Sequence, residues 1–310
     1  MQDIYQFKYF PNRICIPFGL KCNFQCKYCY RDIQRLELPS DLSEAMKCYL
    51  QQVSPSWCES VIASGGEPLI YFNKIKEVFA HVPKDVHKCI MTNGSLLTQE
   101  IVNYINSNDI ELHLSYDGAM TEFLRGVDVL NNERLLNLIR QVRTLMIFSV
   151  VTKYNTDIKA NYEYTVNKLG RADFIYKTNA VFQTPTNKAL IDGFDYDEFA
   201  KTFNYYVFNI LEYSPHYQNI DIKDPHLRTL GGNIDLHGNV IGMATMNKYG
   251  TIFDDRDTLV KRQLELDLDS GFCRSQNCLY RDRCMQQRPM ASEHSCRIEK
   301  ITGEIYNEFD

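Results

Sequence analysis

The sequence lacks every feature that would direct the chain into or across a membrane. No apolar run approaches the ~20 residues that a transmembrane helix needs. Residues 1–8 contain neither the basic start nor the apolar stretch of a secretory signal. The chain also lacks the excess of positive charge that neutralises phosphates, since its formal net charge is −5. We therefore expect a cytoplasmic protein with no membrane partner and no nucleic-acid partner.

Low-complexity segments and internal repeats are absent as well, and hydrophobic residues make up 44% of the 310 residues. This composition supports a large folded core, and the length fits one large domain, with or without a small appendage. Eleven cysteines are present, but a cytoplasmic compartment keeps thiols reduced and argues against a disulfide framework. Metal or cluster ligation is the better explanation for the cysteines that lie in groups.

Between residues 12 and 213, short apolar runs alternate with longer amphipathic ones. The apolar runs predict six β-strands, at residues 13–17, 60–63, 87–91, 111–115, 146–151 and 173–177. The amphipathic runs predict six helices, near residues 42–53, 73–81, 98–107, 132–144, 158–169 and 195–212. Strand–helix pairs in regular order imply parallel strands joined by right-handed crossovers. The predicted fold class is therefore α/β, a partial (βα)6 barrel with its chemistry at the carboxyl ends of the strands.

The pattern changes after about residue 214, where prolines and glycines interrupt the chain as far as residue 232. Residues 233–246 then predict a β-hairpin around residues 236–239, which contain a Gly-Asn turn signal. A charged helix is predicted at residues 256–268, followed by a second group of cysteines. The predicted domains are the partial barrel at residues 1–213 and a small C-terminal extension at residues 214–310, made of the hairpin and cysteine-rich loops.

Three cysteines, Cys22, Cys26 and Cys29, follow the first predicted strand directly. A 4Fe–4S cluster is normally held by four thiolates, so three thiolates in one loop leave one iron open for a small ligand. The Cys26–Cys29 pair alone is also typical of zinc sites and redox dithiols. A zinc site would need a fourth ligand nearby, and the next cysteine or histidine along the chain is Cys48. The spacing alone leaves zinc competitive, but the position directly after the first predicted strand and the aromatic residue before the last cysteine favour a cluster.

This loop resembles the signature of the radical S-adenosylmethionine (SAM) superfamily, in which an aromatic residue, here Tyr28, precedes the last cysteine. Later segments match the family in the right order, each after the next predicted strand: Gly65-Gly66-Glu67-Pro68, Thr92-Asn93-Gly94, Ser115-Tyr116-Asp117-Gly118 and residues 150–155. Glycines at such a turn let backbone carbonyls approach a bound ammonium group. Arg125 could pair with a cofactor carboxylate, because a guanidinium suits that geometry, or could be a solvated surface arginine.

The resemblance implies a specific set of cofactors. Cys22, Cys26 and Cys29 would hold a 4Fe–4S cluster whose open iron chelates the amino and carboxylate groups of SAM. An electron from a donor such as flavodoxin or ferredoxin would cleave SAM to methionine and a 5′-deoxyadenosyl radical, which abstracts a hydrogen atom from the substrate. The residues expected to contact the cofactor are Tyr28, Gly65, Gly66, Glu67, Pro68, Asn93, Ser115, Asp117 and Arg125.

The second group of cysteines consists of Cys273, Cys278, Cys284 and Cys296. It resembles the SPASM extension of the same superfamily, or its shorter twitch relative, in which auxiliary 4Fe–4S clusters are carried. The two-cluster pattern is incomplete here, because Met243 and residues 286–288 stand where the family often has further cysteines. The resemblance therefore implies one auxiliary cluster with four protein ligands. A structural zinc ion fits the same four thiols and stays open as the alternative.

Enzymes with this kind of extension often act on ribosomally made peptides or on active-site residues of other enzymes. The resemblance therefore implies a peptide or protein substrate that is cross-linked, oxidised or epimerised. Because only 21 residues precede Cys22, substrate recognition is expected from a separate partner protein, from the C-terminal tail or from the barrel mouth. A radical dehydrogenase acting on a small molecule is the alternative, and a zinc-stabilised binding module without radical chemistry is a third possibility.

The remaining cysteines, Cys15, Cys48, Cys58 and Cys89, are expected to be core residues, since free cysteine is among the most buried residue types. A thiol at Cys15, beside the cysteine loop, could instead donate a hydrogen atom to a product radical. The seven histidines show no metal-like pairing in the sequence.

Overall fold

Strands and helices alternate along the chain in the predicted order. The computed structural model describes residues 5–29, 37–181, 183, 186–211, 232–242, 247–268 and 293–309. The strands of the barrel are β1 Arg13–Pro17, β2 Ser60–Ser64, β3 His87–Thr92, β4 Ile110–Ser115, β5 Leu145–Val151 and β6 Ile175–Ala180. The main helices between and after them are α1 Glu44–Gln51, α2 Phe72–Phe79, α3 Gln99–Ser107, α4 Thr121–Arg125, α5 Glu133–Arg140, α6 Ile158–Leu169 and α7 Tyr196–Tyr206.

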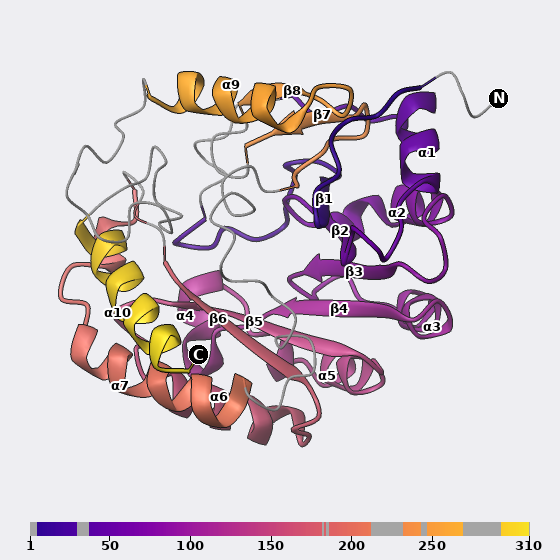
Figure 1. The fold of residues 1–310 in the computed structure, drawn as a ribbon. Coiled ribbons are helices and arrows are strands. Elements are labelled where there is room, and N and C mark those ends of the chain that lie inside the picture. Colours follow the sequence, from indigo (N-terminus) through magenta and orange to yellow (C-terminus); the bar gives the residue numbers. More distant parts are fainter. Residues whose placement is uncertain are drawn as a thin grey trace.

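The six strands form one sheet in the order β1-β2-β3-β4-β5-β6, and every neighbouring pair is parallel. Figure 1 shows this sheet as a curved layer with the helices along its outer side. The predicted α/β class and the partial six-unit barrel are therefore confirmed. Most predicted boundaries lie within two residues of the observed ones, whereas β6 begins two residues later and continues three residues further than predicted.

The two faces of the sheet have different environments, because side chains on a strand alternate between faces. The outer face, which packs against the helices, consists of apolar residues that are fully buried, among them Ile14, Val61, Ile90, Leu112 and Ile147. The inner face carries Cys15, Ile62, Met91, Met146 and Phe148, which are only partly buried, and several polar side chains. The packing that holds the barrel together therefore lies mostly between the sheet and the helices.

Helix starts follow the capping chemistry of the sequence. The side chains of Ser43, Thr98, Asn132 and Asp157 each accept a hydrogen bond from a backbone N–H in the first turn of α1, α3, α5 and α6. Such caps contribute about 1 kcal/mol each. The last predicted helix is regular only as far as Tyr206 and continues as a π-helix over Val207–Leu211.

The hairpin of the C-terminal extension lies beside β1. Ile234 pairs with Val240 around the predicted turn, and β7 Asn239–Ile241 pairs antiparallel with β8 Lys248–Thr251. Cys15 forms an isolated parallel bridge with Asn233, so the extension continues the edge of the barrel sheet. The described part of the predicted hairpin is thus confirmed, and residues 243–246 lie outside the described residues.

Two helices complete the extension. The predicted charged helix is present as α9 Arg256–Leu268, whereas α10 Glu293–Phe309 was not predicted. Helix α10 packs against α7 (Figure 1). The Tyr196 hydroxyl lies 2.8 Å from His294 Nδ1, and the Arg297 guanidinium lies 3.6 Å from the centre of the Tyr196 ring. None of the described helices is both long enough and apolar enough to traverse a bilayer.

Candidate active site

The cysteine loop at residues 18–29 follows β1 and is held by backbone hydrogen bonds against the turn after β2. Phe18 N–H donates to the Ser64 carbonyl over 3.0 Å, and Gly66 N–H donates to the Gly19 carbonyl over 2.8 Å. A third bond runs from Glu67 N–H to the Lys21 carbonyl over 2.9 Å. The cysteine loop and the turn at residues 65–68, the first two segments that resemble the family, are therefore joined into one structural unit.

Gly65 occupies a position that only glycine fits. Its φ of +122° lies in a region that L side chains rarely adopt, and an added Cβ would stand 2.4 Å from the Gly19 carbonyl oxygen. The turn can therefore approach the cysteine loop only because residue 65 has no side chain.

The three thiols of the loop have surroundings that suit metal-bound sulfur. Cys22 Sγ accepts hydrogen bonds from Phe24 N–H at 3.4 Å and from the Asn93 side-chain amide at 3.8 Å. Burial raises the pKa of Cys26 to about 11, opposed by the Arg125 guanidinium and reinforced by nearby Cys29 and Cys22. Cys22 and Cys29 therefore lie near enough to Cys26 to act on its thiol, and an iron cluster would offset the charge that burial disfavours. This donor set fits a cluster with three protein ligands.

Glu67 links the turn after β2 to the turn after β3. Its carboxylate is fully buried and accepts hydrogen bonds from the Thr92 hydroxyl at 2.7 Å and from Asn93 N–H at 2.8 Å. The Asn93 side chain in turn donates to Asn23 Oδ1, inside the cysteine loop, over 3.0 Å. Glu67 thus holds the position of Asn93 with its carboxylate. Pro68 begins the short 3-10 helix Pro68–Tyr71 that follows.

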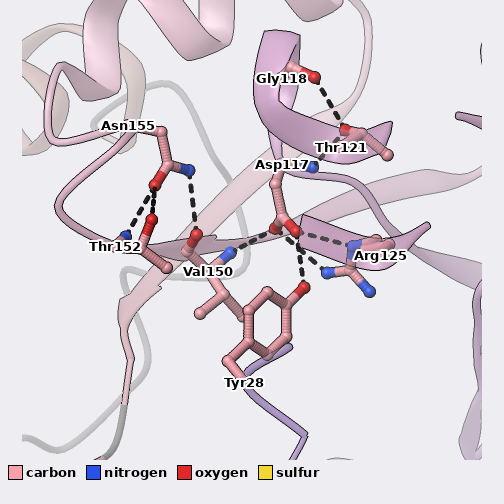
Figure 2. A network of polar contacts seen from close by, with 8 residues as sticks. All are labelled: Tyr28, Asp117, Gly118, Thr121, Arg125, Val150, Thr152 and Asn155. Atoms are coloured by element: carbon pink, nitrogen blue, oxygen red, sulfur yellow. Dashed lines mark hydrogen bonds and ion pairs between the residues drawn. The ribbon is translucent and has the colours of Figure 1, made fainter. Parts of the chain in front are cut away.

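Asp117, after β4, is the centre of a second network (Figure 2). Its carboxylate is 0% exposed and accepts from Tyr28 Oη at 2.5 Å, from Val150 N–H at 2.7 Å and from Arg125 Nε and Nη2 at 2.7 and 3.1 Å. The backbone N–H of Asp117 donates to the Thr121 hydroxyl over 2.9 Å. One buried carboxylate therefore connects the cysteine loop, the turn after β4 and the end of β5.

Arg125 is a buried partner of Asp117, since its side chain is only 7% exposed. Burial lowers its pKa, but Asp117 and the neighbouring Tyr28 outweigh this effect and keep the pKa above its ordinary value. The guanidinium carbon also lies 5.3 Å from the Tyr28 ring centre. The interpretation of Arg125 as a solvated surface residue is therefore wrong, because its side chain on α4 is buried against Asp117.

The end of β5 is fixed by Asn155 in the same region (Figure 2). Asn155 Oδ1 accepts from Thr152 N–H and from the Thr152 hydroxyl, and its Nδ2 donates to the Val150 carbonyl over 3.0 Å. Val150 is thus held through its N–H by Asp117 and through its carbonyl by Asn155.

The structure brings most of the predicted site residues to the carboxyl end of the strands. Ser115 is the last residue of β4 and is partly buried. Of the second cysteine group, Cys296 is exposed on α10, and Cys273, Cys278 and Cys284 lie outside the described residues. Asn23 was not among the predicted site residues, although its position between two of the loop cysteines is a signal for an amide that serves the loop.

Exposed aromatic side chains lie beside the cysteine loop. Phe123 and Tyr154 are 41% and 43% exposed, and their rings meet edge to face with centres 4.9 Å apart. Lys27, between two of the loop cysteines, places its Nζ 3.3 Å from the centre of the Phe123 ring. We call these three residues the aromatic rim.

Comparison with known proteins gives a match to the Radical SAM superfamily model over residues 16–164. The chain is 22% identical over 182 residues to the radical SAM cyclopropyl synthase TigE of Paramaledivibacter caminithermalis, a match that covers 48% of this chain and 39% of TigE. It is 24% identical over 232 residues to the FeMo cofactor biosynthesis protein NifB of Methanocaldococcus infernus, covering 69% and 70% of the two chains. The chain thus spans less than half of TigE.

Solved structures share the fold. The structure of anSMEcpe with bound AdoMet and Cp18Cys peptide has a TM-score of 0.62 and 16% identity, and the match covers 96% of both chains. Streptococcus suis SuiB bound to precursor peptide SuiA has a TM-score of 0.52 and 18% identity, covering 66% of this chain and 47% of SuiB.

Proposed function

The chain belongs to the radical SAM superfamily, and from this premise we propose that it is a radical enzyme that modifies a peptide or a protein. Membership in the superfamily indicates an enzyme that uses a 4Fe–4S cluster and SAM. The proposal rests mainly on the hydrogen bonds that attach the cysteine loop to the turns after β2 and β3. Through these bonds the segments at residues 65–68 and 92–94, which match the family, lie beside the cysteine loop.

In this proposal Cys22, Cys26 and Cys29 hold the cluster, and the turn at Gly65 and Gly66 lies beside it to bind SAM. When bound, the cluster and SAM supply one-electron reduction and a carbon-centred radical able to remove a hydrogen atom from a C–H bond. The protein's own contribution is to bind and orient these groups.

The surrounding residues position the site. The hydrogen bonds from Phe24 N–H and the Asn93 amide to Cys22 Sγ orient that sulfur and stabilise its negative charge. Asp117 keeps the Tyr28 side chain in place through its hydroxyl and neutralises the buried Arg125. We propose that Tyr28 contacts the cofactor and that Asp117 and Arg125 are positioning residues.

Two observations support a peptide or protein substrate. The solved structures of anSMEcpe and SuiB that share this fold were obtained with peptides bound to those proteins. The aromatic rim of Lys27, Phe123 and Tyr154 offers exposed ring surface beside the cysteine loop, and aromatic side chains are enriched where proteins bind one another. A small-molecule substrate remains the alternative outcome of the experiment below.

We propose a division at residues 213–214 between the barrel and a SPASM- or twitch-like extension, and one auxiliary 4Fe–4S cluster on Cys273, Cys278, Cys284 and Cys296. Flavodoxin or ferredoxin would donate the electron, and a separate protein could present the substrate.

The test is anaerobic reconstitution of the full chain with iron and sulfide, followed by reduction in the presence of SAM. We expect about eight irons per chain, four for each cluster, and release of methionine and 5′-deoxyadenosine. Cys22→Ala should lose about four irons and this release, whereas Cys48→Ala, which changes a partly buried cysteine on α1, should lose neither. Bound zinc without SAM cleavage would overturn the proposal.

Substrate class is tested separately with peptides encoded beside the gene. A change in mass of such a peptide that depends on Cys22 supports the proposal. SAM cleavage that is stimulated only by small molecules would replace the peptide-modifying function with the radical dehydrogenase alternative.

A further inference from the structure

A group of potential metal ligands lies on the inner face of the sheet. His87 and Cys89 are on β3, and Glu111 is on β4, where it pairs in register with Cys89. One ligand atom from each of these three residues lies within 4.8 Å of the other two. The sequence shows no metal-like pairing of histidines, because Glu111 is distant from His87 and Cys89 along the chain and only the parallel pairing of β3 and β4 joins them.

One oxygen of the Glu111 carboxylate has a hydrogen-bond partner, and the other has none. Its side chain is 3% exposed, and Oε1 lies 2.5 Å from His113 Nε2. Oε2 is buried and has no hydrogen-bond partner, since the 3.6 Å to His87 Nε2 exceeds the ~3.2 Å limit of such a bond. A buried carboxylate oxygen without a partner costs more than 1 kcal/mol, so a ligand that binds Oε2 would remove a real penalty.

We propose that His87, Cys89 and Glu111 bind a divalent ion of the zinc class on the inner face of the barrel. Imidazole, thiolate and carboxylate are the three side-chain ligands that zinc takes in proteins. Two ligand atoms on a tetrahedral zinc ion with bonds of about 2.05 Å lie ~3.4 Å apart, close to the 3.6 Å between Glu111 Oε2 and His87 Nε2. Three protein ligands leave a fourth position for water or a substrate group, as in catalytic zinc sites.

His113 completes the arrangement as an outer partner. Its contact with Oε1 fixes the Glu111 carboxylate and leaves Oε2 on the side of His87. Partners of this kind typically contribute about 10–100-fold to metal affinity.

Two positive charges, Arg13 and Lys177, lie within electrostatic reach of this group, and each has another contact. The Arg13 guanidinium contacts the Glu59 carboxylate at 2.9 Å, and Lys177 Nζ lies 5.7 Å from the centre of the Phe148 ring. An ion pair between Glu111 and the two histidines is the competing explanation. That explanation pairs Oε2 only with His87 Nε2 over 3.6 Å, leaves Cys89 as a buried core residue, and predicts no metal binding.

The experiment uses the full chain with its iron–sulfur sites loaded, equilibrated with buffered Zn²⁺ and dialysed. We expect the wild type to retain one more zinc ion per chain than Cys89→Ser, and His87→Gln to bind this ion at least 10-fold more weakly. Zinc-edge X-ray absorption, which does not detect iron, should show one sulfur together with nitrogen and oxygen ligands. Cys58→Ser and His81→Gln are the matched controls and should retain the ion, since neither residue belongs to the group.

Equal zinc contents in the wild type, Cys89→Ser and His87→Gln would overturn the proposal, as would a zinc shell made only of sulfur. If Cys89→Ser fails to fold, His87→Gln still decides the question, because the His87 side chain is 32% exposed and tolerates replacement more readily. SAM cleavage is measured on the same samples, so loss of the zinc site and failure of the proposed radical function give separate readings.

Discussion

Replacement of Asp117 by asparagine tests how much the buried network contributes to the fold. Asparagine keeps the size of the side chain and one acceptor oxygen but removes the charge. If that oxygen keeps the bond from Val150 N–H, the new amide nitrogen stands where Oδ2 accepted from Tyr28 Oη and Arg125 Nε. Arg125 is then a buried cation that faces another donor.

The expected loss of folding stability is large, because solvent cannot reach the site to compensate for the missing charge. The Asp117 and Arg125 side chains are 0% and 7% exposed. Removing one partner of a buried ion pair typically costs about 3–5 kcal/mol, whereas an exposed pair contributes about 0–1 kcal/mol. We therefore expect Asp117→Asn to lower the free energy of unfolding by about 3–5 kcal/mol and the melting temperature by an amount of the order of 10 °C.

The assay is urea and thermal unfolding of the variant beside the wild type under anaerobic conditions. Asp173→Asn is the matched control, since Asp173 is also paired with an arginine but is 74% exposed. A double variant, Asp117→Asn with Arg125→Met, should recover part of the loss because it also removes the unpaired charge. An Asp117→Asn variant that is no less stable than Asp173→Asn would show that the buried carboxylate does not stabilise the fold.

Two further predictions concern the cysteine loop and the inner face. Gly65→Ala should destabilise the protein by at least about 2 kcal/mol and lower the iron content after reconstitution, since its Cβ would meet the Gly19 carbonyl at 2.4 Å. Gly193→Ala is the control with a positive φ of +83° and no atom within 4 Å of the added Cβ, and it should keep full iron content. Burial, followed by the charge of Arg13, lowers the pKa of Lys177 from 10.5 to about 8, so between pH 8 and 10.5 the unfolded chain binds more protons and stability rises with pH. The free energy of unfolding of Lys177→Met, measured across that pH range, should lack this rise. If the difference in stability between the variant and the wild type does not change with pH, the pKa of about 8 is wrong.

The strands and helices of the barrel were predictable because each rests on local sequence. The strand β1 has the predicted bounds 13–17, and α6 has the predicted bounds 158–169. Apolar runs fix the strands, and capping residues such as Asp157 fix the helix starts. The cysteine loop was predictable for the same reason, since its three thiols lie within eight residues.

The contacts that shape the site were not predictable, because they join residues from different strands. Nothing near Asp117 in the sequence indicates that its carboxylate receives the Tyr28 hydroxyl and the Val150 N–H. The same is true of Cys89 and Glu111, which become neighbours only through the register of β3 and β4. Helix α10 was missed because its sequence was grouped with the preceding cysteines, whereas its contacts are with α7.

The contrast between the two faces of the barrel sheet has a consequence for how this scaffold can diversify. Burying a large apolar side chain contributes about 1.5–3 kcal/mol, and the fully buried residues of the outer face, such as Ile90 and Leu112, supply this stabilisation against the helices. Inner-face residues such as Met91 and Met146 are only partly buried, so they contribute less. A library of variants at these partly buried inner positions, leaving out the buried Cys89, Glu111 and His113, should therefore stay folded far more often than one at the outer positions. This wall is thus the part of the protein where new substrate preferences can be selected.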